Sequence, residues 1–439
     1  MNSKQKIGIG IAIILVVIGV GFGLITESPD TENSTSMPET VSTKTSTETF
    51  TSSTSQSKEL SGIITIGSIT ALTGDFSSIG EENKESVKLG VSTFNKYLEE
   101  MGALWNLKLI SEDSATNPVI ALEKLTALRS KGIEVSIGPD TSANLQNSKG
   151  YADSNGMIMI SSSSTAPSLA IPDDSIFRMV ADDRKQGVVL GSLLDKYVDV
   201  IIIVWRGDTW GDGLSKTTKA AYEELGGIVD DEGIRYNPET PEFSISVSLL
   251  ADRVQKNVDK YGAENVGVLF LGFAEILQFM QSASAHDILS DVTWYGADAS
   301  AKEYRLIQDD IALKFSNDVQ FTTVQISPTE GEKYTMVENH IINTLGRSPT
   351  AFAYGAFDAV WLVGLTMLHT QSSDADVIKD NIIQVAQGYD GIIGNANLNE
   401  AGDLTDANFD IWIISGAEWI KAGTYYYKDK SITLSDSIS

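Results

Sequence analysis

The sequence predicts an α/β protein made of two doubly wound parallel-sheet lobes, preceded by a transmembrane helix and a disordered stalk. From Gly62 onward, short β-branched strands alternate with amphipathic helices, which is typical of a parallel sheet with helices on both faces. A strand, a glycine-bearing loop and an amphipathic helix open this pattern near Gly62 and open it again near Val198. Residues 1–58 show no such alternation. Two lobes therefore follow a segment of a different kind.

The composition and the motif content exclude several kinds of site. The chain has 439 residues, with 32 basic and 59 acidic side chains and a formal charge of −27. It contains no cysteine, which rules out disulfides, thiolate metal sites and the lipid-bearing cysteine of many secreted binding proteins. With three scattered histidines and no G-x-S-x-G or H-E-x-x-H motif, we expect no enzyme, metal site or cofactor. The acidity argues against binding to nucleic acid.

Residues 1–25 are predicted to anchor the chain in a membrane. Ile7–Ile25 contains 19 residues without a charge, close to the roughly 20 that span a bilayer. Lys4 and Lys6 precede this run and acidic residues follow it, so the rest of the chain should lie outside the cytoplasm. A cleaved signal peptide is the alternative.

Residues 26–59 are predicted to form a disordered stalk. Of the 33 residues from Thr26 to Lys58, 19 are Ser or Thr, and large apolar side chains are nearly absent. Such a segment cannot bury enough surface to offset its chain entropy. A sequon at Asn33 lies in it, so the stalk is either glycosylated or an unmodified linker.

The first lobe is predicted from four strands and the helices between them. Ile63–Ile69 is typical of a strand, and Val87, Val91 and Phe94 recur on one face of the helix that follows. Pro118 suits the first turn of the next helix. Further strands are expected at 107–110, 135–137 and 157–160, with a helix beginning near residue 142.

The second lobe repeats the alternation. Val198–Trp205 is apolar throughout, like the strands of a parallel sheet that is buried on both faces. A glycine-rich loop, Gly207–Gly213, leads into a helix. Later strands are expected at 228–234, 266–271, 293–295 and 411–414, and helices at 243–260 and 276–285. After the second lobe's alternation, three further helices are expected at 330–345, 351–369 and 377–387. The helix at 351–369 is apolar on most faces but interrupted by Asp358, so we expect it in the core and not in a membrane.

Small hydroxyl residues and one carboxylate stand at predicted strand ends, where ligands of α/β proteins bind. Thr141-Ser142 follow one strand, and Ser161-Ser162-Ser163-Ser164-Thr165 follow the next. Hydroxyls and free N–H groups there suit a carboxylate, although helix capping and a flexible serine loop explain them better when taken alone. Asp298 suits either an ammonium group or a helix cap, and Trp210 and Phe273 either close a cleft or pack.

An ordered set of motifs resembles one protein family. The set spans residues 61–425 and comprises Ala71-Leu72-Thr73-Gly74, Ser111-Glu112-Asp113-Ser114, Met157-Ile158-Met159-Ile160, Ser164-Thr165-Ala166-Pro167, Tyr295-Gly296-Ala297-Asp298, Ala353-Tyr354-Gly355-Ala356-Phe357-Asp358 and Asp390-Gly391-Ile392-Ile393-Gly394. It is similar to the branched-chain amino acid type of extracytoplasmic solute-binding proteins, which serve ABC importers. The resemblance implies the type I periplasmic binding protein fold, in which three crossovers form a hinge.

The resemblance also implies domain boundaries. Lobe 1 would comprise residues 60–181 and 328–394, lobe 2 would comprise 182–327 and 395–430, and 431–439 would be a tail. The crossovers would lie near Val180–Asp182, Thr323–Pro328 and Gly394–Asn397.

Carried over by position, the family's site implies roles for seven residues. Ser142 and Thr165 would bind the ligand carboxylate through hydroxyl and backbone N–H groups. The Ser163 carbonyl would accept from the ligand ammonium, and Asp298 would form the ion pair. The side-chain pocket would be lined by Ile79, Trp210 and Phe273. The family often has Tyr at the two aromatic positions, so this pocket would be more apolar.

The implied function is that of a binding protein at the cell surface. It would capture an amino acid, branched-chain or otherwise apolar, and deliver it to the permease and ATPase subunits of an ABC importer. The N-terminal helix would hold it to the membrane, unless that segment is cleaved and the protein is secreted. Two alternatives stay open: a binding protein for urea or short amides, and a ligand-sensing ectodomain.

Overall fold

The structure is a computed structural model that describes residues 59–230 and 233–435. These residues belong to one compact unit, Ser57–Ser439. The transmembrane helix predicted for residues 1–25, and the stalk predicted for 26–59 except its last residue, lie outside the described residues. Both therefore stay predictions.

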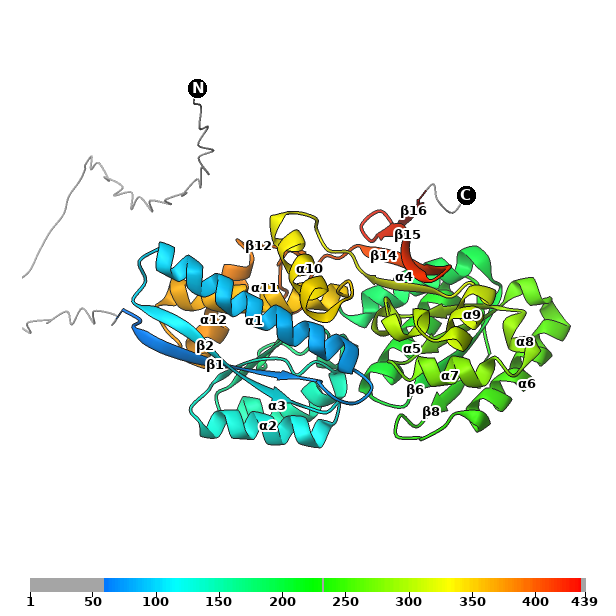
Figure 1. The fold of residues 1–439 in the computed structure, drawn as a ribbon, viewed down its shortest axis with the longest axis horizontal. Coiled ribbons are helices and arrows are strands. Elements are labelled where there is room, and N and C mark those ends of the chain that lie inside the picture. Colours follow the sequence, from blue (N-terminus) through cyan, green and yellow to red (C-terminus); the bar gives the residue numbers. More distant parts are fainter. Residues whose placement is uncertain (1–58, 231–232, 436–439) are drawn as a thin grey trace, which may run out of the picture. The chain divides into compact units, whose positions relative to one another are not determined.

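Lobe 1 is built around a parallel sheet, which in the described chain has five strands in the order β2–β1–β3–β4–β5. The strands are β1 (Gly62–Thr70), β2 (Trp105–Asp113), β3 (Val135–Ile137), β4 (Ile158–Ser161) and β5 (Ile176–Arg178). The helices are α1 (Ser77–Glu100), α2 (Pro118–Ser130), α3 (Ser142–Ser154), α10 (Glu332–Leu345), α11 (Ala351–Thr370) and α12 (Ala375–Ala386). Helices α1 and α10–α12 lie on one side of the sheet, and α2 and α3 lie on the other (Figure 1).

Both faces of this sheet are buried, because successive residues of its strands are apolar. Ile66 and Ile158 belong to the hydrophobic cluster that includes α1 and α11. Ile69 and Met159 belong to the cluster that includes α2 and α3. Strands that are apolar on both faces are expected where helices cover a parallel sheet from both sides.

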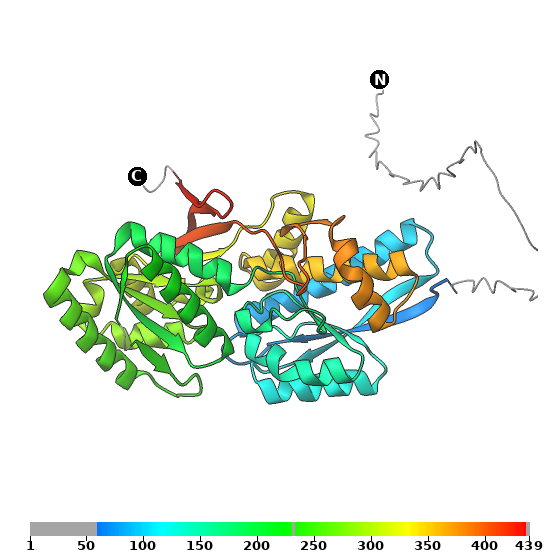
Figure 2. The same ribbon diagram turned by 180° about the vertical axis from the view of Figure 1, so that it is seen from behind.

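Lobe 2 is built around a second sheet, which among the described residues follows the order β16–β15–β14–β11–β10–β9–β6–β7, with β8 also pairing with β6. The strands are β6 (Val200–Arg206), β7 (Ile228–Val229), β8 (Ile234–Tyr236), β9 (Val266–Leu271), β10 (Thr293–Gly296), β11 (Thr322–Ile326), β14 (Phe409–Ser415), β15 (Glu418–Tyr426) and β16 (Ser431–Leu434). The helices are α4 (Asp183–Tyr197), α5 (Thr209–Glu224), α6 (Ser244–Tyr261), α7 (Ile276–Ala283), α8 (Asp287–Ser290) and α9 (Asp310–Asp318). Figure 2 shows this lobe mainly in green, with the red strands of the chain's end along one edge.

We predicted parallel sheets, and for lobe 2 that prediction is wrong at one edge. β14 runs antiparallel to β11, and β15 and β16 continue in alternating directions. Short turns join β14 to β15 and β15 to β16, with Gly416 and Lys430 at φ of 62° and 49°, and strands joined so closely run antiparallel. β16 also occupies Ser431–Leu434, which we assigned to the tail.

The third crossover lies further along the chain than Gly394–Asn397, where we placed it. Arg178, at the end of β5, donates its backbone N–H to the Gly402 carbonyl at 2.8 Å. Its guanidinium binds the Asp403 carboxylate through Nε at 2.5 Å and through Nη2 at 2.7 Å, and both side chains are fully buried. This ion pair ties the segment to lobe 1, so the chain crosses to lobe 2 only beyond Asp403.

Helix α11 has the length and apolar composition of a membrane span, but 83% of its apolar window is buried inside the protein. It packs against α1, where Gly90 and Val360 are in close contact. The expectation that this helix belongs to the core is met. In the part of the chain that the structure describes, no other helix passes the same test.

The first prediction concerns the Arg178–Asp403 pair. Asp403→Asn should lower the free energy of unfolding by about 3–5 kcal/mol, because it leaves a buried guanidinium without its counter-charge. Urea unfolding of residues 57–439 measures this. As a control, Asp318→Asn removes an exposed partner of Lys314 and should cost less than about 1 kcal/mol. Similar losses for the two variants would contradict the role given to the buried pair.

Candidate functional site

The lobe 1 side of the site is formed by the start of α3 and the loop after β4. Thr141 caps α3, since its hydroxyl accepts the Asn144 N–H at 3.3 Å. The Ser142 hydroxyl oxygen accepts from the Ala166 N–H at 3.1 Å and from the Ser164 hydroxyl at 3.2 Å. Ser142 therefore connects the two segments, and neither of these two bonds uses its own hydroxyl proton.

The serine loop after β4 is held in place, whereas the sequence alone favoured a flexible loop. The Ser161 hydroxyl donates to the Pro139 carbonyl at 2.8 Å, and the Ser163 hydroxyl donates to the Asp140 carbonyl at 3.0 Å. Arg178 Nη1 donates to the carbonyls of Ser164 and Ala166 at 3.3 and 2.9 Å. The hydroxyl of Ser163 is thus used within lobe 1.

On the lobe 2 side, Asp298 follows the carboxyl end of β10. Its backbone N–H donates to Gln186 Oε1 at 2.9 Å, and its backbone carbonyl accepts from Gln325 Nε2 at 3.0 Å. Its carboxylate accepts the N–H of the next residue at 2.8 Å. These contacts fix the backbone of Asp298, which is 3% exposed, and no basic side chain pairs with it in the described chain.

A second buried carboxylate, Asp183, lies beside this site, and the sequence analysis missed it. It is the first residue of α4 and donates its backbone N–H to the Thr165 carbonyl at 2.9 Å. Gln186 joins the two acids, because its Nε2 donates to Asp183 Oδ1 at 2.9 Å while its Oε1 accepts from Asp298. In sequence, Asp182-Asp183 is an ordinary acidic helix start, so only the fold identifies Asp183.

Two polar atoms of the site are unused. Among residues 59–230 and 233–435, neither Asp183 Oδ2 nor Thr165 Oγ1 has a hydrogen-bond partner, although both are buried. The Thr165 hydroxyl faces the Asp183 carboxyl and counteracts the rise of its pKa, but the two lack the geometry of a hydrogen bond. Both atoms therefore have a hydrogen-bonding position that no group of the described residues uses.

The two carboxyl groups are electrostatically strained. Burial raises the pKa of Asp298 to about 7. Burial, followed by repulsion from Asp298, raises the pKa of Asp183 well above its ordinary value. Among the described groups that most affect these two pKa values there is no lysine or arginine. A cation placed between the two carboxylates would relieve the strain.

Aromatic rings form a wall where the two lobes meet. Trp210, near the start of α5, and Phe273, after β9, have ring centroids 5.1 Å apart. Phe76 of lobe 1 meets Phe273 edge-on at 4.8 Å, and the Arg206 guanidinium lies 3.7 Å from the Phe273 ring centroid. Arg206 is itself paired with Glu275, so it fixes the ring without adding free positive charge.

Ile79 belongs to the same buried cluster as these rings. It lies in the first turn of α1, which approaches the loop after β1 so closely that a Cβ on Gly80 would lie 1.9 Å from the Ala71 carbonyl oxygen. The seven residues proposed from the sequence are all buried, at most 6% exposed: Ile79, Ser142, Ser163, Thr165, Trp210, Phe273 and Asp298.

The lobes contact one another directly around this site. Ser78 of lobe 1 donates its hydroxyl to Glu303 of lobe 2 at 2.8 Å, and the Ala274 N–H donates to the Asp75 carbonyl at 3.2 Å. A pocket of about 350 Å³ opens between the lobes, lined by Asp75 and Thr141 on one side and by Phe273 on the other. Phe273 is the one predicted site residue among the described residues that line it, and the two buried carboxyls lie outside its lining. Among the described residues, no group of three or more His, Cys, Asp or Glu side chains is arranged to hold a metal ion.

Comparison with known proteins places this geometry in context. The family described as "Receptor family ligand binding region" matches residues 82–417. An uncharacterized protein of Methanocaldococcus jannaschii is 27% identical over 84% of this chain and 91% of its own length. A Leu/Ile/Val-binding protein of Rhizobium johnstonii is 23% identical over 80% of this chain and 91% of its own length.

The fold is that of the type I periplasmic binding proteins. A leucine binding protein from Thermotoga maritima superimposes with a TM-score of 0.71 at 17% identity, over 84% of this chain and all of that one. At this identity the likeness establishes the fold alone.

The second prediction follows from the strained carboxyls. Without ligand, folded Asp298 keeps its proton up to about pH 7, whereas unfolded aspartate loses it near pH 4. Between these values the folded state binds more protons, so the free energy of unfolding falls as pH rises. Asp298→Asn cannot ionise, so it should match the wild type near pH 4 and be more stable near pH 8. The gain should be about 1–4 kcal/mol, since a tenfold change in proton affinity is worth about 1.4 kcal/mol.

Urea unfolding at the two pH values measures the difference. As a control, Asp291→Asn on the surface of lobe 2 should change the free energy of unfolding by less than about 0.5 kcal/mol at either pH. An Asp298→Asn variant that is less stable than the wild type near pH 8 would show that Asp298 is not strained.

Proposed function

The chain belongs to the receptor ligand-binding-region family, and from that premise we propose that it is an extracytoplasmic solute-binding protein for an amino acid. The observation that carries the proposal is the buried pair Asp183 and Asp298, which has no counter-cation among the described residues and adjoins the unused Thr165 hydroxyl. The site offers negative charge and hydrogen-bond donors side by side. That combination suits a zwitterion.

The carboxylate of the ligand would bind at the lobe 1 side. The Ser142 hydroxyl proton and the Thr165 hydroxyl are available there. The N-terminus of α3, a helix of 13 residues, adds backbone N–H groups and the positive end of its dipole. No arginine is required, because neutral donors of this kind suffice to bind a carboxylate.

The ammonium group would lie between Asp183 and Asp298. Asp183 touches Thr165 through its backbone N–H, so the acidic and the hydroxyl parts of the site are neighbours. An α-amino acid carries its ammonium and carboxylate on one carbon, which fits this adjacency. Urea or a short amide would leave both buried carboxylates without a counter-charge, so the site favours an amino acid over these alternatives.

The side chain of the ligand would contact the apolar wall. Ile79, Trp210 and Phe273 present aliphatic and aromatic surface without a hydroxyl. Leucine, isoleucine and valine match such a wall, in keeping with the name of the Rhizobium johnstonii relative. We infer a branched-chain or similarly apolar amino acid.

The protein would act by delivery and not by catalysis. Closure of the two lobes over the ligand would give the form that an ABC permease and its ATPase recognise. Residues 1–25 would hold the protein at the outer surface of the membrane, or would be removed on secretion.

The third prediction tests the ion pair. Residues 57–439, which contain the whole described core, should bind leucine in calorimetric titration. Asp298→Asn and Asp183→Asn should each weaken binding by about 100-fold or more, because losing one partner of a buried charge pair costs about 2–5 kcal/mol. Thr165→Val should weaken it by about tenfold.

Matched ligands and a matched variant sharpen this test. 4-Methylpentanoate lacks the ammonium of leucine and leucine methyl ester lacks the carboxylate, so both should bind at least about tenfold more weakly. Asp358→Asn alters a buried carboxyl of lobe 1 that bonds Tyr389, away from the site, and should leave the affinity nearly unchanged. Acetamide binding that equals leucine binding, or full affinity in Asp298→Asn, would refute the amino-acid proposal.

The fourth prediction concerns the protons that the protein releases when the ligand binds. Near pH 6 the unliganded Asp298 is mostly protonated, since its pKa is about 7, and an ammonium favours the ionised form. Binding should therefore release protons, and the affinity for leucine should rise between about pH 5.5 and pH 7.5. Titrations in buffers of different ionisation enthalpy count the protons. Asp298→Asn should release fewer, and proton uptake by the wild type would contradict the charge assignment.

A further inference from the structure

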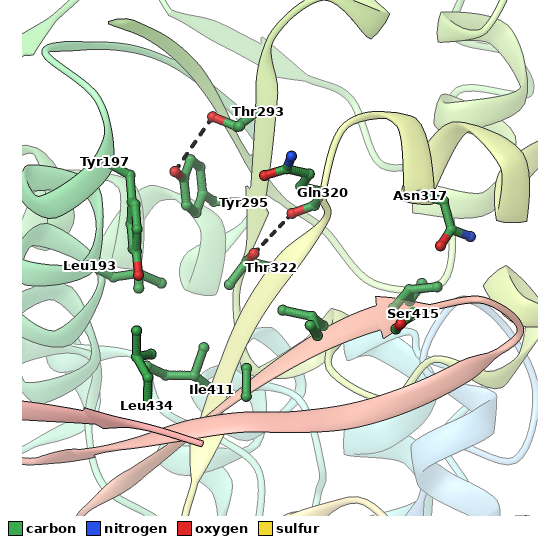
Figure 3. A pocket seen from close by; sticks show the side chains of 13 residues that line it. Leu193, Tyr197, Thr293, Tyr295, Asn317, Gln320, Thr322, Ile411, Ser415 and Leu434 are labelled. Atoms are coloured by element: carbon green, nitrogen blue, oxygen red, sulfur yellow. Dashed lines mark hydrogen bonds between the residues drawn. The ribbon is translucent and has the colours of Figure 1, made fainter. Parts of the chain in front are cut away.

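A second pocket lies on lobe 2, apart from the interlobe site (Figure 3). Its volume is about 600 Å³, which is within the usual range for small-molecule sites. It adjoins the amino ends of β10 and β11, at Thr293 and Thr322, whereas Asp298 follows the carboxyl end of β10. The two sites therefore lie at opposite ends of the strands of the same sheet.

The sheet itself forms the floor of this pocket. Tyr295 of β10 pairs with Thr322 of β11, and Thr322 pairs with Ile413 of β14. The three side chains therefore lie on the same face of the sheet. Leu193 and Tyr197 of α4 stand on one side. β14, β15 and β16 form the other side, and the pairing of β14 with β15 shifts at Ile411/Trp412, an irregularity that bends a sheet edge.

The lining is uncharged. None of the described residues that line the pocket is Asp, Glu, Lys, Arg or His, although the chain has 59 acidic and 32 basic side chains. Apolar surface comes from Leu193, Ile411, Ile413, Ala422 and Leu434. An ion entering this space would lose hydration without gaining a counter-charge, so the lining selects against charged molecules.

Two uncharged hydrogen-bonding groups of the pocket lining remain available, one on the buried residue Tyr295 and one on the exposed residue Gln320. The Tyr295 hydroxyl, on a side chain that is 3% exposed, accepts from the Thr293 hydroxyl at the long distance of 3.4 Å. Within the described chain its own proton has no acceptor. Gln320, at φ of 52°, accepts from the Thr322 hydroxyl only through its backbone carbonyl, and its side-chain amide lies among the lining groups in Figure 3. Gln320 directly follows the C-cap of α9, a position where helices commonly end in the left-handed conformation.

We propose that this pocket binds a neutral, mainly apolar small molecule that carries an uncharged hydrogen-bonding group such as a hydroxyl, amine or amide. The apolar walls take most of the ligand surface, and the Tyr295 hydroxyl and the Gln320 amide orient its polar group. A small molecule fits better than a protein surface, because the polar group offered by Tyr295 is buried at the floor and not on the rim. This site does not depend on the interlobe amino-acid site.

The probe for this proposal is N-phenyl-1-naphthylamine, a neutral fluorophore with one N–H group. Residues 57–439 should bind it saturably, one molecule per chain, with a rise in fluorescence that excess leucine does not displace. 8-Anilino-1-naphthalenesulfonate has the same ring system with an added sulfonate, and it should bind at least about tenfold more weakly, because the pocket lacks a counter-charge.

Two variants locate the bound probe. Thr322→Trp places a large ring in the pocket and should abolish binding, whereas Thr433→Trp, the same change at an exposed position of β16 that does not line the pocket, should leave it unchanged. Tyr295→Phe keeps the ring and removes the hydroxyl, and should weaken binding severalfold. No saturable binding, binding that survives Thr322→Trp, or equal binding of the sulfonate would overturn the proposal. A dimer of residues 57–439 in sedimentation experiments that Thr322→Trp converts to a monomer would overturn it as well, because the pocket would then be an interface between two copies.

Discussion

The buried ion pair between Arg178 and Asp403 holds two distant parts of the chain together: the segment around Asp403 and the loop that carries Thr165. Its two hydrogen bonds hold the returning chain against β5 and so fix where the third crossover begins. The same guanidinium donates to the carbonyls of Ser164 and Ala166 and so shapes the loop that carries Thr165. A fully buried guanidinium is tolerated only when such partners satisfy it, so hinge and loop must form together.

The second constraint is the strain stored at Asp183 and Asp298. Two buried carboxyls held close by Gln186 destabilise the unliganded protein as they ionise. In the proposed function, a ligand ammonium that relieves this strain gains affinity from the same free energy. A structural ion pair would include an arginine or lysine, and neither is among the described groups that most affect the pKa values of these two carboxyls.

The alternation of strands and helices could be predicted from the sequence, because helices must cover both faces of a parallel sheet and so leave a period in the chain. The sequence also indicated that Ser142, Thr165 and Asp298 follow strand ends, which are visible as breaks in apolar runs, and in the structure they follow β3, β4 and β10. Their contacts with a ligand stay predictions. It did not reveal β5, whose three residues include a charged arginine, or the antiparallel edge of lobe 2. Short strands carry too few residues for a period to appear.

Which of these groups contact one another could be seen only in the tertiary structure. Asp183 stands in an ordinary acidic helix start, and Asp403 in a polar turn, and each gains its role from a partner more than 100 residues away. Burial, which sets the pKa of Asp298, and the register that aligns Tyr295, Thr322 and Ile413 around the second pocket are likewise properties of packed elements. The local sequence sets the periodicity of the helices and strands and the direction of the chain. The desolvation of carboxyl groups, and contacts between distant segments, arise only when the sheets and the hinge assemble.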